Sequence, residues 1–421
     1  MQGANGRRAL IVVENSYGPR DTRVWSEAQT LREGGWEVVV VCPAFQDGSG
    51  GTGHDGAWPR PEEIEGVTVH TFPLTPAERG IRGYVAEYAT ALWRVAACVR
   101  KVWRERPFSV IQFCNPPDIF FPIALAYKAR GASAVFDHHD LFPEVVRGRF
   151  GGLVGTVLYR LAALAERLTF RSTDVVLSTN ASYRAIAISR GMVPTERVFV
   201  VRNGPRAEML APTDPVPSLK RGFRYMACYV GLMSQQDGVL EMADMVRHVV
   251  RERGRQDILF ALLGDGAVRQ ETLDRIHDWD LDEYVIAPGM VRDRLLLRQY
   301  ICTSDVCLSP ETSSALNDRS TFIKVGEYMA MGKPILAYEL PETRYTAQGA
   351  AYYVNSGTPE AYADALLDLL ADPARREEMG RQGRERMLRE LAWEHQKPSL
   401  LEAYQLALAR SRASRRRYSA A

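Results

Sequence analysis

Cysteine is scarce in this sequence, with six thiols spread over 421 residues. No two of them form a Cys-x-x-Cys pair, and no histidine spacing completes a metal-binding pattern. Neither a zinc ribbon nor a disulfide scaffold is therefore indicated. The thiols lie mostly inside apolar runs, which is typical of reduced, buried cysteines in a cytosolic protein.

An excess of charge of one sign is also missing. The formal net charge is +2, which gives no support for general nucleic-acid binding. No apolar stretch approaches the roughly 18 residues that a membrane-spanning helix needs. The N-terminus carries a polar lead-in and a short strand pattern where a signal peptide would have an apolar core. We expect a cytoplasmic protein that is soluble or attached to the inner membrane face.

Short apolar runs alternate with helical patterns, which indicates parallel α/β units. At 421 residues, two domains are expected. The first half predicts strands at 8–13, 37–42, 67–71, 109–113, 133–137, 174–178 and 197–201, with helices at 22–33 and 81–104. The second half predicts strands at 224–230, 257–263, 284–287, 305–308, 334–337 and 350–353. We expect domains at 1–205 and 223–395, joined by a proline-rich linker at 206–222.

A dinucleotide-binding dehydrogenase is the first alternative to consider. Its fingerprint needs three glycines after a strand. The loop after the first strand has Gly18 alone, and the turn after 257–263 has Gly264 and Gly266 without a third. A tight strand-to-helix turn explains such a pair equally well. We therefore set the dehydrogenase aside.

Six stretches, taken in order, resemble the motifs of one family, the retaining glycosyltransferases of family 4 with the GT-B fold. They are DTRVWSEAQTLREGGWEVVVVCP (21–43), FDHHDLFPE (136–144), FVVRNGP (199–205), YVGLMSQQDGV (229–239), DVCLSP (305–310) and KVGEYMAMGKPIL (324–336). The resemblance covers nearly the whole chain. It implies two Rossmann-like, doubly wound parallel-sheet domains facing a cleft, with a final helix at 396–421 that packs back on the N-terminal domain and ends in a basic tail.

The family also implies a reaction. A sugar of the hexosyl type moves from a nucleoside-diphosphate donor of UDP or GDP type, held by the C-terminal domain, to an acceptor held by the N-terminal domain. Acceptor classes left open are a polysaccharide, a lipid-linked sugar and a small natural product. Members lack an obvious nucleophile, so we expect front-face displacement, in which the departing diphosphate takes the acceptor's proton. No acidic cluster suggests a bound metal or cofactor.

Glu327 resembles the ribose-binding glutamate of the family, and one carboxylate can accept hydrogen bonds from two adjacent hydroxyls. The alternative is an acidic residue placed favourably near a helix N-terminus. Lys324, one turn earlier, is assigned to the catalytic residues, with a phosphate or local ion-pair role; the alternative is a simple surface lysine. Many members carry a second glutamate eight positions before the ribose glutamate, but this sequence has Arg319 there. The sugar-contacting acid is then absent or moved, with Asp318 and Glu311 the nearest carboxylates.

A second departure concerns the diphosphate. The family often has an arginine and a lysine after the strand that opens the second domain, where this chain has Leu232 and Asp237. Lys324 or Arg202 must supply positive charge, with Arg20 or Arg23 behind them. The remaining donor-side residues that we expect are Gly231, Gly264, Met290, Val291, Glu311, Asn317, Ser320 and Thr321.

In the first domain, His139 and Asp140 follow a predicted strand directly. The family's histidine at this place lies beside the donor sugar, so the resemblance implies a catalytic role for both residues. A turn-capping aspartate beside a surface histidine is the alternative. The loop 15–23 is the best acceptor-side region, through Tyr17, Gly18, Asp21 and Arg23. Gly18 would permit close backbone approach there.

Three alternatives stay open. A nucleotide-sugar epimerase of the same fold would isomerise the donor without an acceptor. A non-catalytic nucleotide-sugar-binding partner protein would bind the donor and transfer nothing. The helix at 81–104, with its basic flank, either packs into the core or docks on anionic lipid as a peripheral membrane contact.

Overall fold

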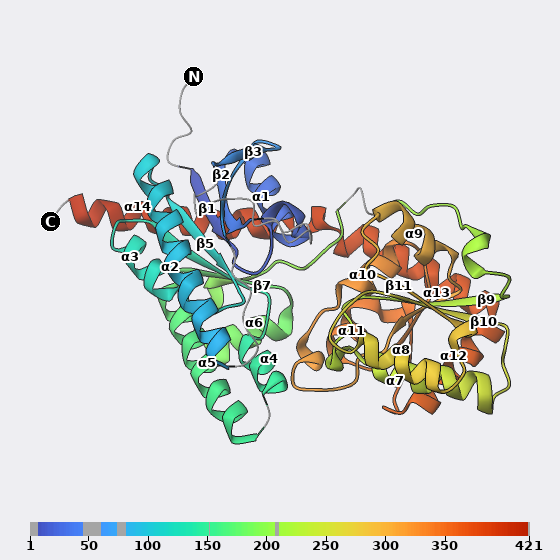
Figure 1. The fold of residues 1–421 in the computed structure, drawn as a ribbon. Coiled ribbons are helices and arrows are strands. Elements are labelled where there is room, and N and C mark those ends of the chain that lie inside the picture. Colours follow the sequence, from blue (N-terminus) through green and yellow to red (C-terminus); the bar gives the residue numbers. More distant parts are fainter. Residues whose placement is uncertain (1–6, 45–59, 74–80, 151, 207–209, 420–421) are drawn as a thin grey trace. The chain divides into compact units, whose positions relative to one another are not determined.

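The computed structural model of the chain describes residues 7–44, 60–73, 81–150, 152–206 and 210–419 (Figure 1). They form two compact units. The first combines the described parts of Met1–Arg202 and Gln396–Ala421, and the second is Asn203–His395. Each unit is a doubly wound α/β domain, which confirms the predicted fold class.

The sheet of the first unit has eight strands in the order β3-β4-β2-β1-β5-β6-β7-β8. The strands are β1 (Arg8–Val12), β2 (Glu37–Pro43), β3 (Glu62–Ile64), β4 (Val67–Phe72), β5 (Val110–Cys114), β6 (Ser133–His138), β7 (Val175–Ser178) and β8 (Val198–Val200). All pairs are parallel except β3 with β4. The seven predicted strands are confirmed to within one or two residues, and β3 was not predicted.

Helices cover both faces of this sheet. The helices are α1 (Thr22–Glu33), α2 (Ile81–Glu105), α3 (Phe121–Lys128), α4 (Phe142–Arg149), α5 (Gly152–Ser172), α6 (Ala181–Ser189) and α14 (Lys397–Ser419). Successive strand residues point to opposite faces. Ile111 and Phe113 pack with α2 and α3, whereas Gln112, between them, accepts a hydrogen bond from Tyr404 of α14 at 2.7 Å. Helices α2 and α3 therefore lie on one face of the sheet, and α14 lies on the other.

The C-terminal helix is part of the first unit's core. Leu400, Ala403, Tyr404 and Ala407 of α14 are fully buried, and the rings of Tyr404 and Trp36 meet edge to face at 5.3 Å. The helix continues through the basic tail to Ser419, and the last two residues of the predicted tail lie outside the described part.

The second unit has a six-stranded, all-parallel sheet in the order β11-β10-β9-β12-β13-β14. Its strands are β9 (Tyr225–Val230), β10 (Ile258–Leu263), β11 (Val285–Gly289), β12 (Val306–Ser309), β13 (Ile335–Tyr338) and β14 (Ala351–Val354). Its helices are α7 (Val239–Arg247), α8 (Arg269–Asp278), α9 (Arg294–Thr303), α10 (Ile323–Ala330), α11 (Pro341–Ala347), α12 (Pro359–Ala371) and α13 (Pro373–Arg386).

The predicted linker is a surface segment of this second unit. Leu210 is buried in its core, and the Val216 N–H donates to Thr303 Oγ1 at 2.8 Å. The prolines broke the helix and strand periodicity without separating the segment from the domain. Residues 207–209 of the predicted linker lie outside the described part.

The order of the strands reverses once in each sheet, between β1 and β5 and between β9 and β12. In open α/β sheets, ligands bind outside the carboxyl ends of the strands at such switch points. Within the described residues, no helix is long and apolar enough to cross a bilayer.

Candidate functional site

The second unit places a buried ion pair at the β9/β12 switch point. Lys324, in the first turn of α10, pairs through its Nζ with Glu311, and lies 3.1 Å from the Tyr229 hydroxyl. The two side chains are 8% and 1% exposed. Burial alone would lower the pKa of Lys324, but Glu311 outweighs it and the pKa is raised. The lysine is therefore a fixed, permanent cation, positioned by Glu311.

Glu311 was expected to contact the donor, and this is corrected by its environment. Its carboxylate accepts from Lys324 and, at 2.5 Å, from Ser309 Oγ, and it is fully buried. A side chain held inward by two donors is not available to a sugar. Its role is to hold Lys324 in place.

Two glycines let the backbone close over this pair. A Cβ added to Gly231 would come within 2.8 Å of the Lys324 Nζ, and one added to Gly264 would come within 1.8 Å of the Gly231 oxygen. Any larger residue would push the turns after β9 and β10 apart. Both predicted glycines act through close packing at the carboxyl edge of the sheet.

Glu327 differs from Glu311 because its carboxylate has no hydrogen-bond or ion-pair partner among the described residues. It is half-buried and is the fifth residue of α10, beyond the first turn in which a helix dipole favours an acid. The helix-terminus alternative thus does not explain it. Burial raises the pKa of Glu327, against the opposing charges of Lys324 and Arg294. The Glu327 carboxyl group is thus a partly buried polar group to which no described residue donates a hydrogen bond.

The loop before α10 is held by its own side chains. Asn317 Nδ2 donates to the Gln236 oxygen at 2.9 Å and to the Thr312 oxygen at 2.8 Å, and Ser320 Oγ donates to the Leu316 oxygen at 2.9 Å. Asn317 was expected among the donor-binding residues, and these two bonds occupy its side-chain N–H groups. Thr321 is half-buried.

Three further residues were predicted on the donor side: Met290, Val291 and Arg202. Met290 is 59% exposed, and Val291 packs on the core of the second unit. Arg202 belongs to the first unit, where its backbone N–H donates to Gln396 Oε1 at 3.0 Å.

In the first unit, His139 lies just past the carboxyl end of β6. Its Nδ1 is 3.0 Å from Asp137 Oδ2, and the backbone N–H groups of His139 and Asp140 donate to Asn115 Oδ1 at 2.8 and 3.0 Å. Asn115 Nδ2 donates in turn to the Asp140 oxygen at 2.7 Å. Burial would lower the pKa of His139, but Asp137 raises it overall. Asp137 and Asn115 fix this turn and were not predicted.

Beneath the histidine lies a charged network. Arg23 donates hydrogen bonds to Asp137 at 3.2, 2.9 and 2.6 Å. It also contacts Glu27 at 3.2 Å and donates to the Val201 oxygen at 2.8 Å. We expected Arg23 to be an acceptor-side handle. This was wrong, because its guanidinium is buried and bound within the unit. Burial would raise the pKa of Asp137, yet Arg23 and His139 hold it below its usual range.

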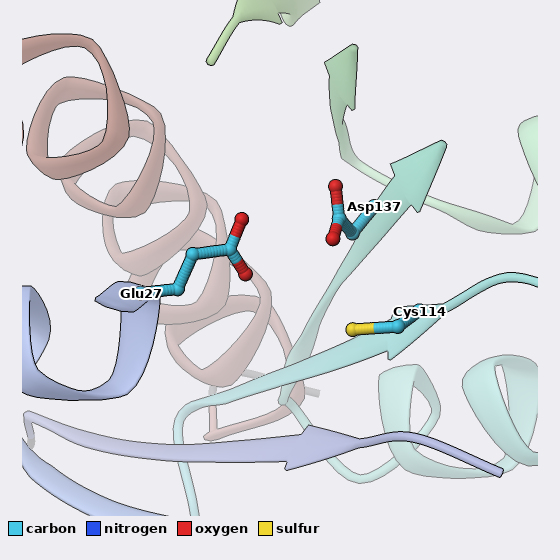
Figure 2. A group of neighbouring side chains, drawn as sticks. All are labelled: Glu27, Cys114 and Asp137. Carbon is cyan, nitrogen blue, oxygen red and sulfur yellow. The ribbon is translucent and has the colours of Figure 1, made fainter. Parts of the chain in front are cut away.

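Glu27, Cys114 and Asp137 converge in this network (Figure 2), with ligand-type atoms within 4.8 Å of one another. A metal would need the thiolate of Cys114, whose pKa burial raises well above its usual value. It would also have to displace the Arg23 guanidinium from both carboxylates. The trio therefore fits a metal poorly and serves to support His139.

The acceptor-side loop is shaped mainly by local structure. Asp21 caps α1, accepting from the Arg23 and Val24 N–H groups, and accepts from Ser16 Oγ at 2.7 Å. A Cβ on Gly18 would lie 2.8 Å from Val40 Cγ1, so packing on β2 explains this glycine. Local structure explains both residues, and their acceptor-side role stays a prediction. Tyr17 is half-buried beside them.

Glu14, just past the carboxyl end of β1, was missed. It is 4% exposed, and its Oε1 has no hydrogen-bond partner among the described residues. Burial, followed by the charge of Glu87, raises its pKa to about 7. Its position in the sequence could have identified it, since Glu14 is a carboxylate directly after a buried strand, and that strand borders the switch point of the sheet.

Comparisons with known proteins agree on the type of domain in both halves. A family model described as "Glycosyl transferase 4-like domain" matches residues 21–204, and one described as "Glycosyl transferases group 1" matches residues 224–372. The chain is 24% identical over 394 residues to chitobiosyldiphosphodolichol beta-mannosyltransferase of Candida glabrata, covering 86% of this chain and 84% of the relative. It is 24% identical over 267 residues to alpha-maltose-1-phosphate synthase of Mycolicibacterium smegmatis, covering 58% and 66%.

Solved structures share the fold. Sucrose-phosphate synthase from Thermosynechococcus elongatus matches with a TM-score of 0.71 at 16% identity, covering 99% of this chain and 100% of that one. HepE from Anabaena, in complex with UDP and glucose, matches with a TM-score of 0.70 at 14% identity, covering 95% and 99%. At these identities the likeness concerns the fold.

Proposed function

This chain belongs to family 4 of the GT-B glycosyltransferases, and from that premise we propose that its second unit binds a nucleoside-diphosphate sugar and its first unit the acceptor. The observation that carries the donor assignment is the partnerless carboxylate of Glu327 beside Lys324. Two adjacent ribose hydroxyls would donate to the Glu327 carboxylate the hydrogen bonds that no described residue donates.

The diphosphate needs positive charge where the leaving group develops negative charge. Lys324 and Arg294 are the two cations whose charges act on Glu327. Lys324 is immobile and Arg294 is exposed, so the first would orient the phosphates and the second would add charge from solvent. This combination would replace the arginine and lysine that the sequence lacks after β9.

The transfer we propose is a front-face displacement with retention. The bond between the anomeric carbon and the diphosphate oxygen breaks, the acceptor oxygen bonds to the same face of that carbon, and the acceptor's proton passes to the leaving diphosphate. Positioning and leaving-group stabilisation would supply most of the rate. No metal is required in this scheme, and activity in excess chelator tests that point.

Stereochemistry must be measured, because the names of the two relatives carry opposite anomeric descriptors, beta in one and alpha in the other. Proton NMR of the product from an α-linked donor would show the α configuration under our proposal. A β product would refute front-face displacement. The mannosyltransferase relative's name describes an acceptor on a lipid diphosphate, which supports the lipid-linked class among the possible acceptors.

The donor is identified by thermal shift with UDP, GDP and other nucleoside diphosphates. A ligand present at 100 times its Kd stabilises the folded state by about 2.7 kcal/mol. Glu327→Ala should weaken the best ligand roughly 10- to 150-fold, from the loss of a charged hydrogen bond. Glu377→Ala, an exposed glutamate of α13, is the matched control and should change nothing.

Two results would contradict the assignment. If no nucleoside diphosphate stabilises the wild-type chain, the donor site is wrong. If one binds Glu327→Ala as tightly as wild type, the ribose role is wrong. Incubating the donor without acceptor also separates the alternatives: isomerised sugar would indicate an epimerase, and binding with neither transfer nor hydrolysis would indicate a non-catalytic partner protein.

A further inference from the structure

The outer face of α5 is apolar in a way that the fold does not require. Six aliphatic side chains on this helix are exposed: Leu153 (86%), Val154 (51%), Val157 (56%), Leu161 (58%), Leu164 (54%) and Leu168 (36%). The opposite side of the helix buries polar residues, including Glu166 and Thr169. Ala162 and Phe170 are buried on that side as well, so α5 has a second, outward-facing apolar stripe in addition to the core-facing stripe of an ordinary surface helix. Contiguous exposed apolar surface of this kind marks an interaction site.

The apolar area continues onto the neighbouring helices. The α3 helix contacts α5 and exposes Leu125 (52%), while α2 exposes Trp93 (65%). Residues of α2 and α3 together line an apolar hollow of about 480 Å³, with Arg100 and Arg130 among its lining residues. The three helices lie on one face of the first unit's sheet (Figure 1).

Aliphatic residues at helical spacing on α2 belong to the core of the first unit. Val95, Val99 and Val102 are fully buried, so the core-packing reading of that helix is the correct one for them. The exposed apolar surface depends chiefly on α5, which the sequence analysis did not single out.

Most of the exposed charge around this surface is positive, against the exposed acid Glu105 at the end of α2. The exposed charged residues of α5 are Arg160, Arg167 and Arg171. The one acid of the helix, Glu166, is buried and pairs with Arg190 at 2.6 Å. On α2, the exposed Arg100, Lys101 and Arg104 add to the same sign.

We propose that the α2–α3–α5 face of the first unit docks on an anionic lipid bilayer surface. A helix with exposed aliphatic side chains between arginines lies in the headgroup region, with the apolar groups in the acyl boundary and the cations on lipid phosphates. A second copy of the chain is a poorer occupant, because pairing two α5 faces would oppose arginine to arginine. A nucleic acid would match the arginines but not the leucines.

Co-sedimentation of the full chain with vesicles tests this. The vesicles are phosphatidylcholine alone, or phosphatidylcholine mixed equally with phosphatidylglycerol. The apolar variant combines Leu153→Ser, Leu161→Ser and Leu164→Ser, and the charge variant combines Arg160→Gln, Arg167→Gln and Arg171→Gln. A control removes the same charge elsewhere, through Arg7→Gln, Arg32→Gln and Arg292→Gln.

We expect the wild type and the control to bind anionic vesicles and to release them as salt rises. The charge variant should lose roughly fivefold in affinity for each arginine removed, and the apolar variant should lose binding even at low salt. All substituted side chains are exposed, so melting temperatures should be unchanged.

Three outcomes would overturn the proposal. In the first, the wild-type chain stays in the supernatant with anionic vesicles. In the second, the control loses vesicle binding as fully as the charge variant does. In the third, light scattering shows a wild-type dimer that the apolar variant converts to a monomer. The last would make the face a self-association surface. None of these outcomes depends on nucleotide binding, so the proposed transfer reaction is tested separately.

Discussion

Replacing Lys324 by methionine separates the stability that its ion pair contributes from the chemistry that we assign to it. The change keeps most of the side-chain volume and removes the ammonium that pairs with Glu311 and lies 4.2 Å from the centre of the Tyr229 ring. Glu311, 1% exposed, then keeps a buried negative charge without its cation. Removing one partner of a buried pair costs about 3–5 kcal/mol. For a unit of this size, the melting temperature should fall by roughly 6–20 °C.

Scanning calorimetry of the full chain measures the fall, with Lys220→Met as control. Lys220 pairs with Asp305 at 2.7 Å in the same unit, but both side chains are 21% exposed, so the loss should be about 1 kcal/mol or less. The double variant Lys324→Met with Glu311→Gln removes both buried charges and should regain most of the stability. It should not regain donor turnover, because the phosphate-orienting cation is still absent.

Two results would refute this reasoning. If Lys324→Met melts with the wild type, the pair is not the buried contact that the structure describes. If the double variant turns over donor at the wild-type rate, Lys324 is a structural residue and the diphosphate is bound by other groups.

Three further predictions concern the first unit. Because Glu14 is buried, the first unit should be most stable below pH 4.5 and should lose stability as the pH rises through the folded pKa of Glu14, about 7. The variant Glu14→Gln should remove this loss, which is about 3 kcal/mol. Melting curves recorded against pH measure it. Tyr404→Phe leaves the Gln112 oxygen buried without its donor and should cost roughly 1–3 kcal/mol in urea unfolding; an unchanged midpoint would contradict this role. Asn115→Ala removes three hydrogen bonds around His139 and should lower kcat roughly 10- to 100-fold, with KM for the donor little changed. An equal loss in both constants would assign Asn115 to donor binding.

The strands were predictable because each buried parallel strand is a short apolar run bounded by turn residues. β2, predicted at 37–42 and observed at Glu37–Pro43, is representative. β3 was missed because Glu62–Ile64 is a three-residue edge strand with exposed acids, and nothing in its composition favours a strand. The segment 206–222 was predicted as an interdomain linker because its prolines end the helix and strand periodicity. Prolines have this effect whether or not the segment packs on a domain, and this one packs on the second unit.

The site was harder to predict, since its residues meet only in three dimensions. Arg23 and Asp137 are 114 positions apart, and a single sequence does not reveal that one neutralises the other. From local context, Arg23 was assigned an acceptor-side role and Asp137 was assigned no role. Glu327 was proposed from its resemblance to the family's ribose-binding glutamate, and Lys324 was added because it lies one helical turn before it. Glu311, 13 positions before Lys324, was found with the wrong role.

The place of α14 in the first unit also bears on how the protein is made. The ribosome finishes Met1–Arg202 and then the whole of Asn203–His395 before it delivers Gln396–Ala421. At about 5–20 residues per second this interval is roughly 10–40 s. Throughout it, Gln112 and Trp36 lack the tyrosine that covers them in the finished chain. The second unit has all of its strands first, so it can reach its native state earlier. The first unit to be synthesised is therefore the last to be completed, and in the interval it is the part of the nascent chain that a chaperone would bind.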